Sequence, residues 1–501
     1  MERAYCDFID EITSDELYEG LLGYGMFADK LPPMFTSESF YEFSKSISQP
    51  FNKQRKNYIY FESIRQNNIP RPLGIPNPLG YQQLCKALAD NWDKIKDHFH
   101  KMTDDNAYKV SRIHIRKEKD KKILFEMNYK NWKQDGSPEL DILIGNKYLV
   151  KSDISTCFPS IYTHSIPWAL VTKAVAKQQI NNKTEWYNQL DELCRKLRDG
   201  ETHGLLIGPH ASNLISEIIL TCVDKKLYDK GWRYLRNIDD YNCYVDSHAN
   251  AEKFLTDLNE ALREFDLPIN YKKTSIQELP KASTNHWIRG LASAIPSDEN
   301  IPIDFKMARS YLDTAISLME SNDNDAAILK YAIKVISKRK LSYNAKQYCL
   351  KTIEHYAVLY PYLIILMDDY VFTPFEAEIL DIQNFADIIF KDAIKTDNYE
   401  LMYYALFYAI KYNFNLMNFN LDYIITCSSC ILKLLAWTYC KQKKDKESAK
   451  KIKEYVLSIK DTDFEQNWIL CYEVLNQIEL KNDWKILKKA KISFIKDEYH
   501  F

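Results

Sequence analysis

The sequence predicts an α+β protein in which a region built around antiparallel strands is followed by a long all-α region. Three observations predict this class. The apolar run 148–150 leads directly into Asp153, as at the end of a buried strand. Apolar and aromatic residues flank Asp239 and Asp240, as in a β-hairpin with both acids at its turn. After Gly290 the chain contains no glycine, and apolar residues recur at helical spacing.

Length and charge limit the possible classes of protein. The chain has 501 residues, which is too many for one ordinary core, so we expect two to four domains or subdomains. Hydrophobic residues make up 46% and charged residues 27%, as in an ordinary globular protein. The 67 basic residues are balanced by 69 acidic ones. This balance argues against a broad phosphate-binding track and permits a small local one.

The sequence contains no recognisable targeting or membrane segment. Its first residues lack the basic and then apolar pattern of a signal peptide. The longest apolar run, residues 356–367, contains Pro361 and is too short to span a bilayer. Eleven scattered cysteines, an odd number, are typical of reduced thiols rather than of a disulfide framework. We therefore expect a cytoplasmic protein that does not use a membrane.

Three regions follow from these patterns. Residues 1–147 form an N-terminal region of mixed elements, residues 148–290 carry the strands and the chemistry, and residues 291–501 are all-α. The last region should contain roughly eight helices of about 15–20 residues, paired antiparallel and stacked as a solenoid or bundle. It holds equal numbers of acidic and basic residues beyond position 300.

Asp153, Asp239 and Asp240 form the strongest candidate site. Buried carboxylates are costly unless they are paired or bind a metal ion. Asp153 alone could cap a helix, but with two acids at a later hairpin tip the set matches the needs of two-metal phosphoryl transfer. Mg²⁺ takes oxygen ligands, and the protein supplies only a few of them.

A glycine-rich loop lies between the two acidic positions. Gly204, Gly208 and Pro209 predict a tight turn, and Ser212 or Asn213 could cap the helix that follows. Such a loop lets the backbone approach a ligand closely. Its place between Asp153 and Asp239 links it to the same site.

The order of these motifs resembles the palm of reverse transcriptases. A strand ending in Asp-x4-Phe comes first, then G-x3-G-x3-S, then the Asp-Asp hairpin, then "LPINYKKTSI" at 267–276. The stretches "YTHSIPW" (162–168) and "RPLGIPNPLGY" (71–81) and the helical region are similar to the abortive-infection branch of that family, the AbiK type. The resemblance implies fingers and palm followed by a HEAT-like helical domain in place of a thumb, so residues 1–147 would include the fingers.

The resemblance also implies roles for individual residues. The three aspartates would bind two Mg²⁺ ions, or Mn²⁺ in their place. Phe158 would be a steric gate against a ribose 2′-OH, although it could be plain core. Gly208 would lie near the incoming nucleotide. Lys273 would donate a proton to pyrophosphate, although Lys272 and Lys273 could equally be a solvated pair. Arg71 would hold the triphosphate.

The implied activity is untemplated, protein-primed DNA synthesis from dNTPs in bacterial defence against phage, by a prophage-encoded enzyme. The single-stranded DNA product could stay covalently attached, and the chain would form a homo-oligomer, a trimer or hexamer. One alternative is a templated RNA-directed DNA polymerase with a nucleic-acid primer. Another is an inactive palm that serves as an oligomeric scaffold. Asn237 replaces the family's usual aromatic residue before the Asp pair, and Leu206-Ile207 replaces its Pro-Gln. Both changes argue against templated copying.

Protein priming requires a hydroxyl that reaches the metal site. Tyr24 lies between Gly23 and Gly25, and flanking glycines relax the backbone. The similar region of AbiK-type enzymes also carries the priming tyrosine, so Tyr24 is the first candidate. Tyr5 and Tyr18 are the next candidates, and an ordinary surface aromatic is the alternative interpretation of Tyr24.

Overall fold

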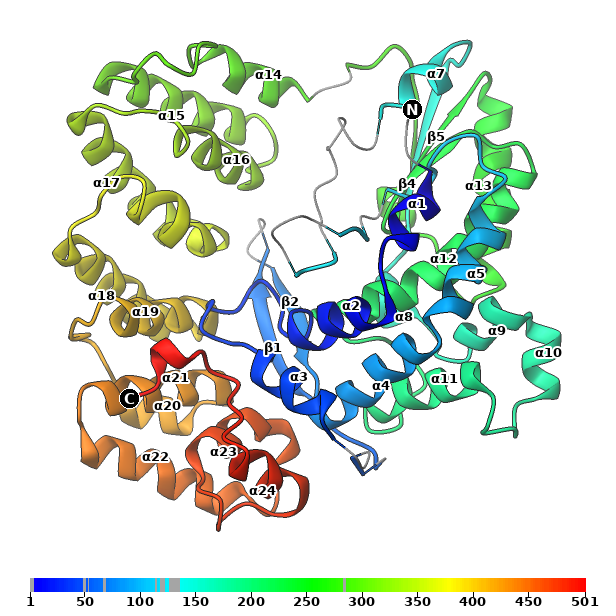
Figure 1. Ribbon diagram of the computed structural model, residues 1–501. Coiled ribbons are helices and arrows are strands. Elements are labelled where there is room, and N and C mark those ends of the chain that lie inside the picture. The colour runs from blue at the N-terminus through cyan, green and yellow to red at the C-terminus, as the bar shows by residue number, and fades with distance from the viewer. Residues whose placement is uncertain are drawn as a thin grey trace.

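The computed structural model describes residues 4–501 except 48–50, 53, 66–68, 113–114, 118–121, 126–135 and 283–284. Two groups of elements face one another in Figure 1. The sheet and its helices lie on one side, a curved row of helices lies on the other, and the β1–β2 hairpin stands between them. The chain is therefore organised around this hairpin and the palm sheet.

The N-terminal region combines short helices with one hairpin. Its elements are α1 (Tyr5–Asp10), α2 (Ser14–Tyr18), the π-helix η1 (Glu19–Gly23), α3 (Glu38–Lys45), β1 (Ile59–Ile64), β2 (Pro70–Ile75), α4 (Pro78–Asp90), α5 (Trp92–Thr103) and α7 (Glu139–Leu143). β1 and β2 pair antiparallel, with Ile59 opposite Ile75. Asn77 starts α4, because its side chain accepts the Leu79 amide at 3.1 Å and Pro78 follows it.

The palm sheet has four strands in the order β4-β5-β3-β6, and each neighbouring pair is antiparallel. The strands are β3 (Tyr148–Asp153), β4 (Tyr234–Asn237), β5 (Asp240–Val245) and β6 (Ser275–Glu278). The expected strand before Asp153 and the expected hairpin at Asp239-Asp240 are confirmed. Along β5, buried Tyr241, Cys243 and Val245 alternate with more accessible residues, as a sheet with one covered face requires.

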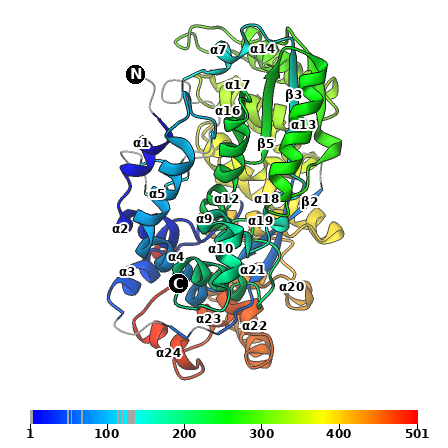
Figure 2. The same cartoon turned by 90° about the vertical axis from the view of Figure 1, so that its right-hand side faces the viewer.

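Eight described helices belong to the same region as the sheet, and some of them pack on it. They are α8 (Cys157–Ser160), α9 (Ser165–Val171), α10 (Lys173–Gln178), α11 (Trp186–Lys196), α12 (His210–Asp229), α13 (His248–Arg263), the 3-10 helix η2 (Tyr271–Lys273) and α14 (His286–Ser293). α13 packs on β3 and β5, and Figure 2 shows it in front of them. Gly290 lies inside α14, where a Cβ would come within 3.0 Å of Leu318, so it permits close packing of α14 on α15.

Residues 291–501, all of which are described, contain no β-strand. Their elements are α15 (Phe305–Glu320), α16 (Ala327–Ile336), α17 (Tyr343–Leu359), η3 (Pro361–Leu366), η4 (Met367–Phe372), α18 (Ile379–Thr396), α19 (Tyr399–Lys411), α20 (Leu421–Thr426), α21 (Cys430–Gln442), α22 (Lys446–Ile459), η5 (Glu465–Asn467), α23 (Trp468–Val474), α24 (Asn482–Lys489) and η6 (Asp497–Tyr499). The expected eight helices of 15–20 residues are wrong in number and length. Ten α-helices of 6 to 18 residues run from α15 to α24.

The all-α expectation holds although the region has no glycine to end its helices. Glycine commonly takes the left-handed conformation after a helix. Here Asp397, Asn413 and Lys444 take it instead, with φ of 51°, 54° and 58°, just after α18, α19 and α21. Pro361 starts a 3-10 helix after α17 and prevents one longer helix. Consecutive helices pack on one another, α18 on α19, α19 on α21 and α21 on α22 and α23.

The described chain supports the expected thiol chemistry. All eleven cysteines are free, and ten of them are buried. No described helix combines the length and the apolar character that a bilayer crossing needs.

The C-terminal segment joins the end of the helical region to the N-terminal region. Thr36 donates its amide to the Phe494 carbonyl at 3.0 Å, and Lys496 donates its amide to the Met34 carbonyl at 2.9 Å. The Phe494 side chain is fully buried and packs against Trp468 and Phe40. Figure 1 shows this segment beside α3, so the row of helices returns to the start of the chain.

We expect Phe494→Ala to lower the free energy of unfolding by about 3–5 kcal/mol, because it leaves a cavity at this junction. Urea unfolding followed by far-ultraviolet circular dichroism measures the change. Phe501→Ala is the matched control, because that ring is 51% exposed. Equal unfolding midpoints for the two variants would contradict the proposed importance of the junction.

Candidate active site

The ends of two adjacent strands bring the three aspartates together. Asp153 is the last residue of β3 and pairs with Asp240, the first residue of β5. Asp239 occupies the two-residue turn between β4 and β5, and its carbonyl accepts the Ile154 amide at 3.2 Å. Antiparallel register therefore places acids that are distant in sequence at one edge of the sheet.

Asp153 is only 4% exposed, and its two carboxylate oxygens differ. Oδ2 lies 2.7 Å from the Lys273 ammonium and accepts a hydrogen bond from Asn270 at 3.1 Å. Oδ1 is buried and has no hydrogen-bond partner in the described part of the chain. A buried carboxylate oxygen without a partner is costly. Such an oxygen beside two further acids fits a cation ligand.

Mutual repulsion makes this cluster receptive to positive charge. Burial, followed by the charges of Asp153 and Asp240, raises the pKa of Asp239 to about 6. Burial and the charge of Asp153 also raise the pKa of Asp240. The hydrogen bond to Asp153 raises the pKa of Lys273, so this lysine holds its proton and partly balances the acids. Oxygen ligands of this kind suit Mg²⁺.

The aspartates are more widely spaced than a closed metal cage. Among the described residues, one group of three His, Cys, Asp or Glu side chains has all its ligand atoms within 4.8 Å of one another, namely Cys6, His100 and Asp104. The three aspartates do not meet this distance. Cys6 is a poor metal ligand, because burial raises the pKa of its thiol to about 12 and the metal-binding form is the thiolate. Mg²⁺ usually keeps several waters, so widely spaced aspartates remain suitable for it.

A strained turn presents Asp239. Ile238 has a φ of +57°, which is rare for a β-branched residue. Arg236, at the same turn, donates a hydrogen bond to the Ile238 carbonyl at 2.8 Å. Strain of this kind persists only where neighbouring contacts hold it. Arg236 thus holds the turn in place.

Arg236 is completely buried and forms two ion pairs with α12. Its guanidinium lies 3.0 Å from Glu217 and 2.6 Å from Asp224. Tyr5 and Ser111 donate hydrogen bonds to Glu217 at 2.8 and 2.7 Å. The network therefore ties α1, α12 and β4 together beneath the turn. Sequence reasoning missed it, because a single arginine in a strand gives no sign of its partners.

Phe158 and Gly208 lie on neighbouring segments. Phe158 is half-buried in α8, and its carbonyl accepts the Leu205 amide at 2.8 Å. Gly208 has a φ of +128°, and a Cβ there would meet Ala28 at 3.2 Å and the Gly74 carbonyl at 3.3 Å. The close approach predicted for this loop is therefore present, although the atoms approached belong to the protein.

The helix after this loop begins earlier than its sequence suggested. α12 starts at His210 with Pro209 before it, so the prediction that Ser212 or Asn213 caps the helix is wrong. The Ser212 amide bonds to the Pro209 carbonyl at 3.1 Å, inside the first turn. A proline just before a helix needs no amide partner and can start it without a capping side chain.

Arg71 lies on β2 and takes part in a basic cluster that the sequence did not reveal. Burial is the main cause that lowers the pKa of Lys30, and the charges of Arg71 and Lys334 lower it further. Burial and the charges of Lys30 and Lys334 lower the pKa of Lys330 to about 8. The ammonium groups of Lys30 and Lys330 lie 5.0 and 4.8 Å from the centre of the same Tyr362 ring. We call Lys30, Arg71, Lys330 and Lys334 the basic cluster.

The basic cluster joins the helical region to the loops around Gly208. Lys330 and Lys334 come from α16, whereas Lys30 lies two residues after Ala28, which packs against the Gly208 position. Glu400 and Asp29 act as counter-charges on Lys30, and Glu400 also accepts the Ile64 amide at 2.6 Å. Burial and the neighbouring cations still lower the pKa of Lys330, so positive charge is concentrated here. No sequence pattern signals this, because the four residues are far apart along the chain.

Tyr24 is the most accessible of the three candidate priming tyrosines. Tyr5 and Tyr18 are buried, and burial raises the pKa of Tyr18 well above its usual value. Tyr24 is half-buried, and its ring lies 5.4 Å from the Lys122 ammonium. Gly25 serves close packing rather than mobility, because a Cβ there would meet His210 at 2.7 Å. In the described part of the chain, Tyr24 makes no contact with any of the three aspartates.

Comparison with known proteins gives one family match, which covers the strands that carry the three aspartates. The family model for reverse transcriptase (RNA-dependent DNA polymerase) matches residues 70–294. That range has a reverse-transcriptase-like polymerase fold, which supports nucleotidyltransferase activity. It includes Arg71, Phe158, Gly208, Lys273 and the three aspartates, but neither Tyr24 nor most of the helical region. A comparison with curated proteins gives no match.

Among solved structures, the chain is similar to three telomerase structures from Candida tropicalis. The apo enzyme is 11% identical, over 87% of this chain and 76% of that one, with a TM-score of 0.34. The complex with a TWJ fragment of telomeric RNA is 13% identical, over 84% and 66%, with a TM-score of 0.32. The apo form truncated from its C-terminal domain is 12% identical, over 50% and 55%, with a TM-score of 0.27. The chain thus spans only 66% of the complex and 55% of the truncated form. TM-scores below 0.5 do not establish a shared fold, so the family match carries the comparison.

We expect Asp239→Asn to stabilise the metal-free protein at pH 7.5. An acid whose pKa is raised from 3.8 to about 6 costs stability as pH rises through that interval, and the cost is complete above it. Removing the charge should recover about 2–3 kcal/mol at pH 7.5 and far less at pH 4. Thermal melting in EDTA at the two pH values measures this difference.

Asp246→Asn is the control for this prediction. Asp246 follows β5 and is exposed, and its hydrogen bond from Asn250 lowers its pKa. Its neutralisation should give no gain in melting temperature. A gain from Asp239→Asn that is the same at pH 4 and pH 7.5 would show that charge repulsion is not the cause.

Proposed function

We propose that this protein is a reverse-transcriptase-like DNA polymerase that joins dNTPs into single-stranded DNA without a template, using one of its own tyrosines as primer. The observation that carries the polymerase assignment is the pairing of Asp153 with Asp240 beside the Asp239 turn, with one Asp153 oxygen buried and unpartnered. The family match over the same residues supports it.

Two Mg²⁺ ions, or Mn²⁺, held by Asp153, Asp239 and Asp240 would supply charge neutralisation at the reacting phosphate. Lys273 is 63% exposed and holds a proton beside Asp153. An ammonium at this position can donate a proton to the departing pyrophosphate. Asn270 orients Asp153 by bonding to its carboxylate and, through the backbone, to its carbonyl.

The basic cluster supplies the phosphate-binding side of the site. Arg71 would hold the triphosphate of the incoming nucleotide, because a guanidinium suits phosphate oxygens. Lys30, Lys330 and Lys334 would add charge from the N-terminal loop and from the helical region. The crowding that lowers the pKa of Lys330 is relieved when an anion binds. Gly208 and Phe158 would contact the same nucleotide, with Phe158 limiting access of a 2′-OH.

The region after the palm supports synthesis without a template. A templated polymerase grips a duplex with basic surface. Residues beyond 300 carry no net charge and form packed helices instead. Asn237, half-buried at the end of β4, replaces an aromatic residue. Templated RNA-directed synthesis from a nucleic-acid primer is the second candidate, favoured by the description of the matching family.

The helical region also supports self-association into a trimer or hexamer. α18 exposes Ile379, Leu380 and Ile388, at 56%, 63% and 50%. Met417, 74% exposed, lies near Ile388, since its amide bonds to Asp387 at 2.6 Å. Exposed apolar side chains that gather on one surface favour a protein partner. A second copy of this chain is the partner that we propose.

The cellular role that we propose is abortive infection in the bacterial cytoplasm, by a prophage-encoded, AbiK-type enzyme. The motifs "YTHSIPW" and "RPLGIPNPLGY" support this branch of the family. The helical region, packed as successive helix pairs, supports the HEAT-like assignment. On this view residues 1–147 carry the fingers, 148–290 the palm and 291–501 the domain that replaces a thumb.

The test of the activity is incorporation of labelled dNTPs by the purified protein with Mg²⁺ and no added nucleic acid. We expect label on a protein of reduced mobility in denaturing electrophoresis. Asp153→Asn and Asp239→Asn should abolish it, because each removes a charged oxygen ligand, whereas Asp246→Asn should retain it. Incorporation only after addition of primer and template would establish the second candidate, and no incorporation under either condition would leave a scaffold.

Tyr24→Phe tests the primer, because it removes the hydroxyl and keeps the ring. We expect the covalent protein–DNA adduct to disappear while the melting temperature stays unchanged. A phenol with a pKa near 10 is a better nucleophile precursor than an aliphatic alcohol. Tyr41→Phe, on the adjacent helix α3, is the control. An adduct of normal yield in Tyr24→Phe would assign priming to another residue, which mass spectrometry of the nuclease-trimmed adduct identifies.

A further inference from the structure

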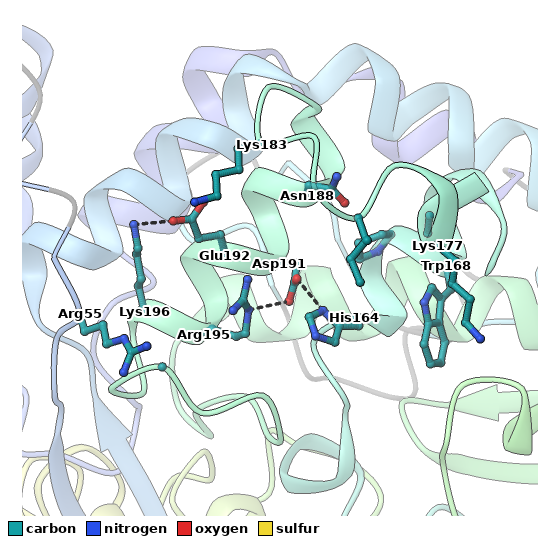
Figure 3. A pocket seen from close by; sticks show the side chains of 14 residues that line it. Arg55, His164, Trp168, Lys177, Lys183, Asn188, Asp191, Glu192, Arg195 and Lys196 are labelled. Carbon is teal, nitrogen blue, oxygen red and sulfur yellow. Dashed lines mark hydrogen bonds and ion pairs between the residues drawn. The ribbon is translucent and has the colours of Figure 1, made fainter. Parts of the chain in front are cut away.

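A pocket of about 360 Å³ lies among α9, α10 and α11, apart from the three aspartates. Arg55, from the segment before β1, closes one end of it. Its lining includes none of the residues assigned above to metal, nucleotide or primer. Figure 3 shows His164 at its centre, with Arg55, Arg195, Lys196 and Lys183 toward one end and Trp168 toward the other. The pocket therefore has a cationic end and an aromatic end.

Positive charge exceeds negative charge in this lining. Five cationic residues face two acids, Asp191 and Glu192. Glu192 is neutralised by Lys196 at 2.7 Å, and Asp191 accepts from Arg195 at 3.3 Å. Among the described residues, Arg55 and Lys177 form no ion pair, and Lys183 acts on Glu192 only through the longer-range attraction that helps to lower the pKa of Glu192. They leave a surplus of cations for a ligand.

The position of Arg55 depends on Gly200. Gly200 has a φ of +92°, and a Cβ there would lie 2.8 Å from the centre of the Arg55 guanidinium. The Lys56 amide also bonds to the Lys196 carbonyl at 2.7 Å, and the Asp199 amide bonds to the Lys56 carbonyl at 2.9 Å. These contacts hold an otherwise exposed arginine at the mouth of the pocket. A guanidinium at this position is suited to phosphate oxygens.

His164 is fixed by a buried carboxylate. Its Nδ1 lies 2.7 Å from Asp191, which is 5% exposed. A histidine that donates from Nδ1 to a carboxylate has its ring orientation set and its Nε2 left for a ligand. This histidine belongs to the stretch "YTHSIPW", none of whose residues is assigned to the polymerase site. The buried Asp191 is thus the anchor of a built site.

The other end of the pocket is mainly apolar, with Lys177 beside Trp168. Pro167, Trp168, Ala176 and Ile180 line it. Small-molecule sites commonly combine such a surface with a few convergent polar groups, in cavities of about 300–1,000 Å³. A ligand that matches both ends has an anionic group and a flat apolar ring system.

We propose that this pocket binds a nucleoside phosphate, at a site separate from the polymerase active site. The phosphates would lie on Arg55, Lys183 and Arg195, and the base would lie against Trp168 and Ile180. The same chemistry is found in a free nucleotide and in the 5′-phosphorylated end of a DNA strand. The proposal goes beyond the polymerase function and does not require it.

The pocket is connected to the segments that carry Phe158 and Gly208. Tyr162, two residues before His164, pairs with His203 in an antiparallel bridge, and their rings stack at 4.9 Å. The Gly204 amide bonds to the Ile161 carbonyl at 2.8 Å. A ligand in this pocket therefore contacts the same two chain segments that lead to the polymerase site.

Equilibrium dialysis of labelled dATP against the full-length protein in EDTA tests the proposal, since binding at the aspartates depends on metal, and every variant is measured in an Arg71→Gln, Lys334→Gln background that weakens triphosphate binding at the basic cluster. We expect one dATP per chain, with affinity at least about tenfold weaker in the double variant Arg55→Gln, Lys183→Gln. Both side chains are exposed, so the fold should be preserved. The matched control, Lys485→Gln, Lys489→Gln, removes two exposed charges from α24 and should bind normally. Asp239→Asn should also bind normally, which separates this site from the proposed polymerase activity.

Further arms identify the ligand. Inorganic tripolyphosphate should compete more weakly than dATP, because it lacks the base; equal competition would overturn the nucleoside part of the proposal. An oligonucleotide with a 5′-phosphate that outcompetes dATP, and loses this advantage in the double variant, would identify the DNA end as the source. Absence of dATP binding in EDTA, or equal affinity in wild type and double variant, would overturn the proposal.

Discussion

The ion pairs of Arg236 with Glu217 and Asp224 are the interaction on which the active-site half of the structure depends. A guanidinium with no exposed surface is tolerated only because carboxylates and a carbonyl satisfy it, and removal of one partner from such a network is strongly destabilising. The network fixes β4 against α12 and donates directly to the strained Ile238 turn. Tyr5 extends it to the first helix of the chain. The position of Asp239 therefore depends on residues from four separate segments.

Opposite charges gather in two separate clusters of the structure. The palm edge gathers three carboxylates, and burial followed by their mutual repulsion raises the pKa of Asp239. The β2 strand, the loop at Lys30 and α16 gather four cations, and burial followed by repulsion from Lys30 and Lys334 lowers the pKa of Lys330. Each cluster is unfavourable alone. Metal ions at the first and phosphate at the second would relieve both, so a metal-bound nucleotide is the ligand class that suits the pair.

The helical region contributes more than a scaffold in this arrangement. Two of the four cations belong to α16, and buried Glu400 of α19 accepts hydrogen bonds from β1 at Ser63 and Ile64. The segment around Phe494 then attaches the far end of the region to the N-terminal loops. Because the row of helices is held at both ends, the lysines of α16 stay close to the β1–β2 hairpin. A thumb that moves freely would not hold them there.

The sequence by itself determined the local elements and the identity of the acidic site. An apolar strand ending in Asp153 and a two-residue turn at Asp239 are local patterns, and strand periodicity with turn chemistry is enough to place them. The all-α nature of residues 291–501 also followed from periodicity. Helix lengths and the start of α12 were predicted wrongly from the sequence. Asp397, Asn413 and Lys444 take the left-handed conformation after a helix, where glycine is expected, and Pro209 precedes α12, where a capping serine is expected.

Only the tertiary structure decided which distant residues meet. The sequence around Arg236 does not indicate that it pairs with Glu217 and Asp224. Nor does the sequence indicate that Lys30 lies near Lys330, or that Arg55 lines the same pocket as His164 and Asp191. Charges act through space and not along the chain, so the basic cluster and the second pocket exist only once separate segments pack together. Five roles stay predictions, because each depends on a nucleotide or a DNA strand that the fold must first position. They are the roles of Phe158, Gly208, Lys273, Arg71 and Tyr24.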